Sequence, residues 1–159
     1  MNRIKSQKIE DFLKSLSSSS PTPGGGAVAA LAGALAVSLV EMVTNLTREK
    51  ILDVEKITQI RKELLRLADE DCQAFDAVMT AYKSKSKQKI RKSLVKAIEV
   101  PERVMVLSAG VEKLAFVTIK KGNKNAVSDA KSALHLARAA RKSAEENIKI
   151  NKKALASLK

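Results

Sequence analysis

The stretch from residue 17 to residue 40, SSSSPTPGGGAVAALAGALAVSLV, constrains the fold of this chain more than any other part of it. A loop rich in serine, proline and glycine leads directly into an uncharged run of small and aliphatic residues. Such a run predicts a helix that is buried almost all round. Three glycines at its start, Gly24, Gly25 and Gly26, leave backbone N–H groups free and allow another group to approach closely. We therefore expect a ligand site where this helix begins.

Apolar residues recur at helical spacing through the rest of the chain, and no stretch alternates as a strand does. The pattern predicts helices over residues 5–16, 25–48, 54–83, 90–98 and 101–120, and a last helix from residue 125 onward. The predicted break before residue 101 rests on Pro101, which favours the first turn of a helix. Gly122 is expected to end the next helix in the left-handed conformation. These elements predict an all-α, up-and-down helical bundle, with residues 1–159 forming a single domain.

The chain is strongly basic. Its 30 Lys and Arg residues against 17 Asp and Glu residues give a formal charge of +13, which attracts anions. Basic residues are densest over residues 83–96, and a set of solvated helix faces or a basic nucleic-acid-binding module would both account for them. Aromatic residues make up only 3% of the chain, which argues against base stacking, and no nucleic-acid reading motif is visible. A nucleic-acid partner is therefore not expected.

Other sequence features bear on the cellular compartment and on possible metal or nucleophilic sites. The apolar run 24–40 is slightly short and weakly hydrophobic for a membrane span, and Glu41 follows it at once, so a buried core helix is the better interpretation. The charged N-terminus lacks the apolar segment of a secretory signal. The single cysteine, Cys72, excludes an intramolecular disulfide and fits a reducing compartment. We expect a cytoplasmic protein without membrane attachment. One cysteine and one histidine, His135, argue against a metal site, and nothing local supports a nucleophilic pair between them.

Two aspartates interrupt the apolar stripe of the predicted helix 54–83. Asp71 shares a helix face with Phe75 and Val78 and is expected to point inward, whereas Asp69 lies nearer the boundary. A carboxyl group among apolar side chains has its pKa raised by desolvation, toward the range useful for acid–base chemistry. A solvated acidic turn is the alternative interpretation.

Two further polar clusters are open to two interpretations each. The segment GNKNAVSDA, residues 122–130, offers hydrogen-bonding groups to a ligand, but its asparagines can also cap the following helix. Asn147 and Asn151 are one helical turn apart, so they either contribute to a site together or lie exposed.

Several of these motifs resemble one family. PTPGGGAVAALAGALAVSLVEMVTNLT resembles the opening of the cyclodeaminase domain of formiminotransferase-cyclodeaminase. ADEDCQAFDAVMTAYK, EVPERVM, GNKNAVSDA and SAEENIKIN resemble its acidic helix, its proline-started helix, its glycine–asparagine turn and its paired-asparagine helix. The matches follow the family's order along almost the whole chain. The loop after Tyr82 departs from the family, because lysines and serines replace a Leu-Pro-Lys sequence.

The resemblance implies an all-helical homodimer. The implied reaction converts 5-formiminotetrahydrofolate to 5,10-methenyltetrahydrofolate and ammonia, with tetrahydrofolate as the substrate carrier and no metal. Some proteins of this kind are methenyltetrahydrofolate cyclohydrolases, which leaves that activity as the alternative. The folate would lie in a cleft lined by the glycine-rich loop and the acidic helix.

Under this resemblance each polar cluster has an expected role. Asp71 is the first choice as acid–base group, Asp69 is its close competitor, and Asp129 is the next candidate. The expected substrate-binding residues are Gly24, Gly25, Gly26, Asn123, Asn125, Ser128 and Asn147, and Lys83 and Lys85 are expected to attract a polyglutamate tail.

Overall fold

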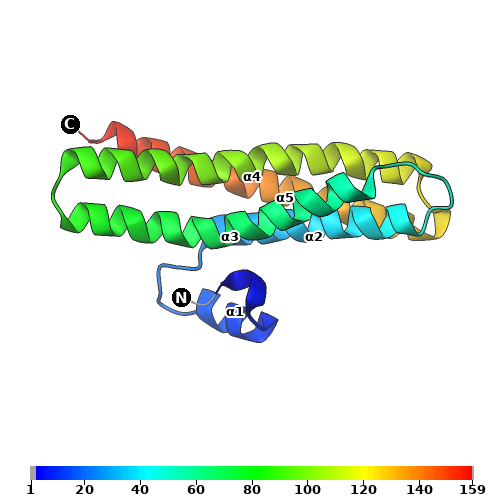
Figure 1. Cartoon of the computed structure of the whole chain (residues 1–159), viewed down its shortest axis with the longest axis horizontal. Helices are drawn as coiled ribbons and strands as arrows, with labels where there is room; N and C mark the ends of the chain where they lie inside the picture. The colour runs from blue at the N-terminus through cyan, green and yellow to red at the C-terminus, as the bar shows by residue number, and fades with distance from the viewer. Residues whose placement is uncertain (1–2, 159) are drawn as a thin grey trace.

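Four long antiparallel helices form the body of the molecule, as the computed structural model of the chain shows for residues 3–158 (Figure 1). They are α2 (Gly25–Asn45), α3 (Val54–Lys83), α4 (Lys87–Lys121) and α5 (Val127–Ala156). Shorter elements are η1 (Ile4–Ser6), α1 (Ile9–Leu16) and η2 (Lys124–Ala126). No strand occurs among the residues described. The prediction of an all-α, up-and-down bundle is confirmed.

The four helices differ in length, and this difference creates the site. At 1.5 Å per residue, α2 is about 30 Å long, α3 and α5 are about 45 Å and α4 is about 50 Å. Figure 1 shows that α2 begins only part-way along the bundle. The end that carries the α3–α4 turn therefore has three helices instead of four. The N-terminus of α2 faces the space that a longer helix would have filled.

Small residues let α2 pack very closely on its neighbours. A methyl group at Gly33 would lie 3.1 Å from Ser108 Oγ on α4 and 3.2 Å from Leu64 on α3, so a larger residue has little room there. The expectation that α2 is buried almost all round is wrong on one side. Leu35 is 59% exposed and Met42 is 38% exposed, because the bundle covers only the inward part of the helix.

By length and composition α2 could cross a membrane. In this bundle, 56% of its most apolar 18-residue stretch is buried against the other helices. Its inward face thus serves as the centre of the core, and the remaining face is apolar and uncovered.

The predicted helix break before Pro101 is wrong, because α4 runs without interruption from Lys87 to Lys121. A proline within a helix has no N–H for the carbonyl four residues earlier, here that of Ala97. The side chain of Asn151 on α5 replaces that donor, with Asn151 Nδ2 donating to Ala97 O at 2.8 Å. The missing hydrogen bond is thus supplied from a neighbouring helix.

Other details also differ from the prediction. The first predicted helix is divided into η1 and α1, and the second ends at Asn45 instead of residue 48. Gly122 is extended (φ −76°, ψ 177°) and not left-handed. It is a glycine for a different reason, since a methyl group there would collide with the carbonyl of Thr118.

Candidate functional site

A pocket of about 450 Å³ lies where α2 begins, in the three-helix half of the bundle. The start of α2 and the loop before it form one wall. α3 and α5 form the sides, and α4 contributes the floor. The lining residues are Pro21, Thr22, Gly24, Gly25, Gly26, Asp71, Ala74, Phe75, Val78, Met79, Tyr82, Leu94, Ala97, Asn147, Ile150, Asn151 and Ala154.

Asp71 is the acidic residue of this pocket. Desolvation by the surrounding protein raises the pKa of its carboxyl group, and a hydrogen bond from the backbone N–H of Ala27 opposes that shift. Ala27 lies in the first turn of α2, whose N-cap residue, Gly24, provides no side-chain cap. Asp71 therefore caps α2 from α3, at the positive end of the helix dipole. The result is a carboxyl group whose pKa is raised but whose position is fixed.

The three glycines have different roles. A methyl group at Gly26 would overlap the carboxyl group of Asp71, so only glycine allows that carboxyl group to reach the helix start. A methyl group at Gly25 would lie 3.7 Å from Asn147 Nδ2, which is ordinary contact. The sequence predicted a close approach at this point, and Gly26 is where it occurs.

Asn147 and Asn151 both line the pocket and both are partly buried. Asn147 Nδ2 donates to the carbonyl of Ser143 at 2.8 Å, which leaves the amide oxygen of Asn147 to accept a hydrogen bond from a ligand. The side-chain N–H of Asn151 is already used, because it donates to the carbonyl of Ala97. The interpretation that the pair lies exposed is wrong; both side chains reach the pocket, where Asn147 can accept a hydrogen bond from a ligand and Asn151 forms a structural hydrogen bond.

Apolar side chains at the pocket are more exposed than is usual for their size. Met79 is 45% exposed and Tyr82 is 43% exposed, and both extend from α3 on the side of Asp71. Tyr82 was not among the residues predicted for the site. The sequence could have indicated it, because Tyr82 is the single tyrosine of the chain. It lies eleven residues, or three helical turns, after Asp71 and therefore on the same face of the helix.

Asp69, the second predicted acid–base group, is not brought into the pocket. Its Oδ1 accepts a hydrogen bond from the backbone N–H of Ile4, with 2.5 Å between the two atoms. The two aspartates are two residues apart and therefore face in different directions around α3.

The segment 122–130 lies at the opposite end of α2, about 30 Å from the glycines. Asn123 Oδ1 caps η2 by accepting from the N–H of Asn125 at 2.9 Å, and Asn123 Nδ2 donates to the carbonyl of Leu46. Ser128 is exposed, and Asp129 lies partly buried in the first turn of α5. Within one chain neither the predicted substrate-binding residues of this segment nor Asp129, the third predicted acid–base candidate, lines the pocket.

Residues 3–158 contain neither a reactive cysteine–histidine pair nor a cluster of metal-binding side chains. Cys72 is buried in the core, where desolvation and nearby carboxylates raise the pKa of its thiol to about 11. His135 is exposed on α5 and forms no pair with it. No group of three or more His, Cys, Asp or Glu residues in the described part could hold a metal ion.

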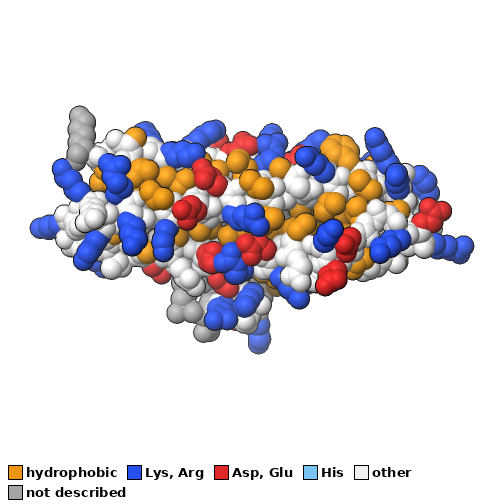
Figure 2. Space-filling model, turned by 45° about the horizontal axis from the view of Figure 1, so that its top comes forward, with side chains coloured by type: hydrophobic (Ala, Val, Ile, Leu, Met, Phe, Trp, Pro, Cys, Tyr) orange, Lys and Arg blue, Asp and Glu red, His pale blue; other side chains and the backbone are white. Residues whose placement is uncertain are grey.

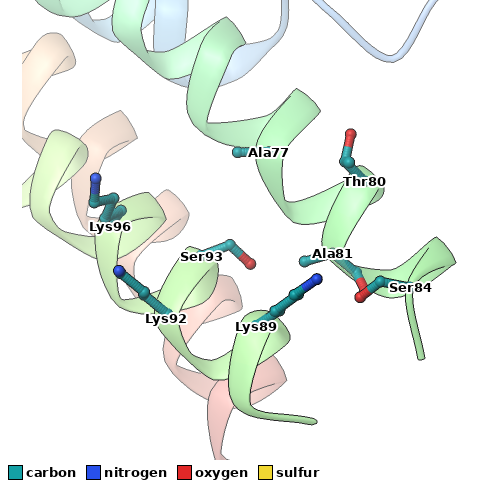
Figure 3. Close-up of a pocket in the computed structure, with 8 residues that line it drawn as sticks. All are labelled: Ala77, Thr80, Ala81, Ser84, Lys89, Lys92, Ser93 and Lys96. Carbon is teal, nitrogen blue, oxygen red and sulfur yellow. The ribbon is translucent and has the colours of Figure 1, made fainter. Parts of the chain in front are cut away.

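A second hollow, of about 430 Å³, lies between α3 and α4. Three of its lining residues are the α4 lysines Lys89, Lys92 and Lys96. Figure 3 shows Lys89 leaning from α4 toward Ala81 and Ser84 of α3. We refer to this feature as the lysine groove.

The lysine groove belongs to a strongly basic end of the bundle. Residues 77–98 contain seven basic residues and no acidic one, and no ion pair among the described residues involves any of the seven. In Figure 2 this is the left-hand end of the visible face, where Lys and Arg side chains gather without acidic neighbours. Lys83 ends α3, and Lys85 lies in the turn with φ 55°. Neither lines the pocket.

Comparison with known proteins decides the family. Residues 8–158 match the formiminotransferase-cyclodeaminase family. The chain belongs to this family. The prediction made from its motifs is confirmed, and with it the prediction of an enzyme of this kind.

Two family members illustrate the relationship. A methenyltetrahydrofolate cyclohydrolase from Methylorubrum extorquens is 39% identical over an alignment that covers 94% of this chain and 81% of that protein. The crystal structure of a formiminotetrahydrofolate cyclodeaminase from Thermotoga maritima is 34% identical, with a TM-score of 0.90, and the match covers 97% of this chain and 82% of that one. The two relatives are named for different activities, and the Thermotoga maritima structure shows the fold of this chain.

Proposed function

We propose that this member of the formiminotransferase-cyclodeaminase family is a folate-dependent cyclodeaminase. It would convert 5-formiminotetrahydrofolate to 5,10-methenyltetrahydrofolate and ammonia. The observation that carries the proposal is the Asp71 carboxyl group, which lies in the pocket with a raised pKa at the start of α2. The Thermotoga maritima cyclodeaminase shares the fold along nearly the whole chain.

The proposed reaction needs one group that takes a proton and returns it. N10 of the folate bonds to the carbon of the protonated formimino group, and the Asp71 carboxylate removes the proton from N10. The resulting carboxylic acid gives that proton to the amino group on the same carbon. The carbon–nitrogen bond then breaks, ammonia leaves, and the N5 lone pair forms the methenyl cation. A raised pKa suits this role because both protonation states must be reached near neutral pH.

The rest of the pocket suits a pterin-like ring. Phe75, Met79 and Tyr82 offer an apolar surface beside the carboxyl group. The amide oxygen of Asn147 and the free N–H groups at the start of α2 offer an acceptor and donors to polar ring edges. Pockets that are mainly apolar with a few fixed polar groups are typical of small-molecule sites.

The test follows the absorbance of methenyltetrahydrofolate formed from the formimino substrate by purified protein. The Asp71→Asn variant should lose kcat by about 10²- to 10⁴-fold, because its amide keeps an acceptor for Ala27 but cannot take up and return a proton near neutral pH. Asp76→Asn, which alters an exposed aspartate on the same helix, is the matched control and should keep full activity. Undiminished turnover by Asp71→Asn would sink the assignment.

A second candidate is the cyclohydrolase reaction, which the 39% identical Methylorubrum extorquens protein favours by its name. Water would attack the methenyl carbon while Asp71 accepts its proton, and the carbon–N5 bond would then break as N5 takes up a proton, which leaves a formyl group on N10. Loss of methenyltetrahydrofolate absorbance faster than the spontaneous rate, without turnover of the formimino substrate, would establish this candidate over the first.

We also propose that the carboxylates of a polyglutamate tail of the folate bind the basic end of the bundle. Lys83 and Lys85, predicted for this role, lie at the turn between the pocket rim at Tyr82 and the lysine groove. From Asp71 to Ser84 the distance along α3 is about 20 Å, so a tail leaving the pocket along α3 would reach these lysines. Their charges have no acidic partner within the described residues, which leaves them available to carboxylates.

Comparison of mono- and pentaglutamate substrates tests this part. Replacing Lys83, Lys85 and Lys89 together by glutamine should raise KM for the pentaglutamate by about 3- to 30-fold and leave the monoglutamate nearly unchanged. A matched triple replacement of Lys120, Lys121 and Lys124, at the other end of the bundle, should affect neither. Equal effects of the two triple variants would refute a specific tail contact.

We propose that the uncovered apolar face of α2 is the interface of the expected homodimer. Leu35 and Met42 are exposed on this face, Leu31 and Leu39 are partly buried, and the exposed Leu46 follows directly after the helix. An antiparallel two-fold pairing of α2 helices would bring residues 122–130 of the second copy toward the pocket, because that segment lies at the far end of α2. The predicted roles of Asn123, Asn125, Ser128 and Asp129 depend on this arrangement.

Light scattering of the protein at micromolar concentration should give twice the chain mass. The Leu35→Asp/Met42→Asp variant should be monomeric and should lose turnover, because each charge would have to be buried unpaired. Wild-type protein that is active and monomeric at the assay concentration would contradict the proposal.

A further inference from the structure

The N-terminal segment stands beside the bundle and has little core of its own (Figure 1). No residue of α1 is buried, and Ile9 and Leu13 are 79% and 53% exposed. The loop that follows α1 contributes Pro21 and Thr22 to the pocket. One wall of the pocket therefore depends on how firmly this segment is held.

The segment is anchored at Ile4. This residue is 7% exposed and belongs to the main core cluster, and η1, in which it lies, packs on α3. Its backbone N–H donates to Asp69 Oδ1 across 2.5 Å, between residues 65 positions apart in the chain. A charged acceptor makes such a hydrogen bond stronger than a neutral one.

α3 thus presents two aspartates to two different partners. Residues two positions apart on a helix are separated by about 200° around its axis. Asp71 lies in the pocket and Asp69 binds the N-terminal segment. Both act on the same wall, since Asp71 caps the start of α2 and Asp69 fixes the chain that leads into it.

We propose that Asp69 is a positioning residue, which holds residues 3–23 on α3 and so keeps the Pro21–Thr22 wall in place for the ligand. It acts as a hydrogen-bond acceptor and carries no proton in the reaction. The effect on substrate rests on the proposed function of the pocket, whereas the anchoring of Ile4 does not.

Two substitutions separate a positioning role from a proton-carrying one. Asp69→Asn keeps an oxygen that can accept from Ile4, whereas Asp69→Ala removes it. We expect Asp69→Asn to stay within about 3-fold of wild type in KM and kcat, and Asp69→Ala to raise KM about 10-fold with a smaller change in kcat. The pH profile of kcat should have the same midpoint in Asp69→Asn and in the wild type.

Hydrogen exchange of the protein without substrate provides the independent readout. Asp69→Ala should speed exchange of the Ile4 amide by at least about 10-fold and loosen residues 17–23, with the four long helices unchanged. Asp76→Ala on the same helix is the control and should leave exchange at Ile4 unaltered. Wild-type exchange at Ile4 in Asp69→Ala would overturn the proposal whether or not the pocket binds folate. So would a loss of kcat in Asp69→Asn as large as that in Asp71→Asn.

Discussion

Replacing Gly26 by alanine is the sharpest test of how the site is built. The new methyl group would occupy the space of the Asp71 carboxyl group, so either that side chain rotates away from Ala27 or the first turn of α2 moves. Overpacking of this kind costs about 1–3 kcal/mol. Alanine also recovers about 0.4–1 kcal/mol by restricting the unfolded chain. The net expectation is a loss of up to about 2.5 kcal/mol in the free energy of unfolding.

Gly25→Ala is the matched control, because its methyl group meets Asn147 Nδ2 at an ordinary 3.7 Å. It should stabilise the protein by about 0.4–1 kcal/mol. For a chain of this length each kcal/mol moves the melting temperature by about 2–4 °C. Calorimetry should therefore place Gly26→Ala below the wild type and Gly25→Ala slightly above it.

A double-mutant cycle identifies the cause of the loss. In an Asp71→Ala background the methyl group at position 26 has no carboxyl group to displace, so its cost should disappear. Gly26→Ala should also lose turnover, since it moves the proposed acid–base group. Equal melting temperatures of the Gly25 and Gly26 variants would refute the close approach on which this reasoning depends.

Three other predictions follow from single contacts. Because the pKa of Asp71 is raised in the folded protein, the folded state binds its proton more tightly than the unfolded state, so this group costs stability as pH rises from its ordinary value of about 4. Asp71→Asn should therefore raise the melting temperature at pH 7, and the gain should vanish below about pH 4; a gain that grows toward acid pH would contradict this sign. Asn151→Ala should lower the free energy of unfolding by about 1–3 kcal/mol in urea titrations, because the Ala97 carbonyl loses its donor. Adding Pro101→Ala should restore part of the lost free energy of unfolding, because the N–H of the new alanine can then donate to the Ala97 carbonyl. Strictly additive effects of the two substitutions would argue against the hydrogen bond from Asn151 as a replacement for that donor. Finally, Cys72 should resist alkylation in native protein at pH 8 and react after unfolding, since burial raises the pKa of its thiol to about 11; rapid native labelling would show that the core opens there.

The helical pattern predicted most elements well, and the failures have identifiable causes. The bounds of α3 agree with the prediction because its caps and stripe are local features. The break before Pro101 was wrong because the donor that lets the helix continue comes from Asn151, 50 residues away. The burial of α2 was overestimated because a uniformly apolar sequence does not say which side the other helices cover.

The candidate site was predicted in part. Local sequence pointed to Asp71 beside Phe75 and Val78, and to a close approach at Gly24–Gly26. It could not separate Asp69 from Asp71, since the difference lies in what each aspartate faces across the fold. Nor could it show that residues 122–130 lie a full helix length away from the glycines.

The sequence by itself determined the all-α class, most of the helices, the family and the expectation that another group lies close to the start of α2. Those follow from periodicity and from residues that act on their immediate neighbours. Only the tertiary structure decided that Asp71 caps α2 and that Asn151 supplies the hydrogen bond that Pro101 cannot give to α4. It also showed that the short α2 leaves a pocket among three longer helices. Each of these depends on helix lengths and on contacts between residues far apart in the chain, which no local pattern records.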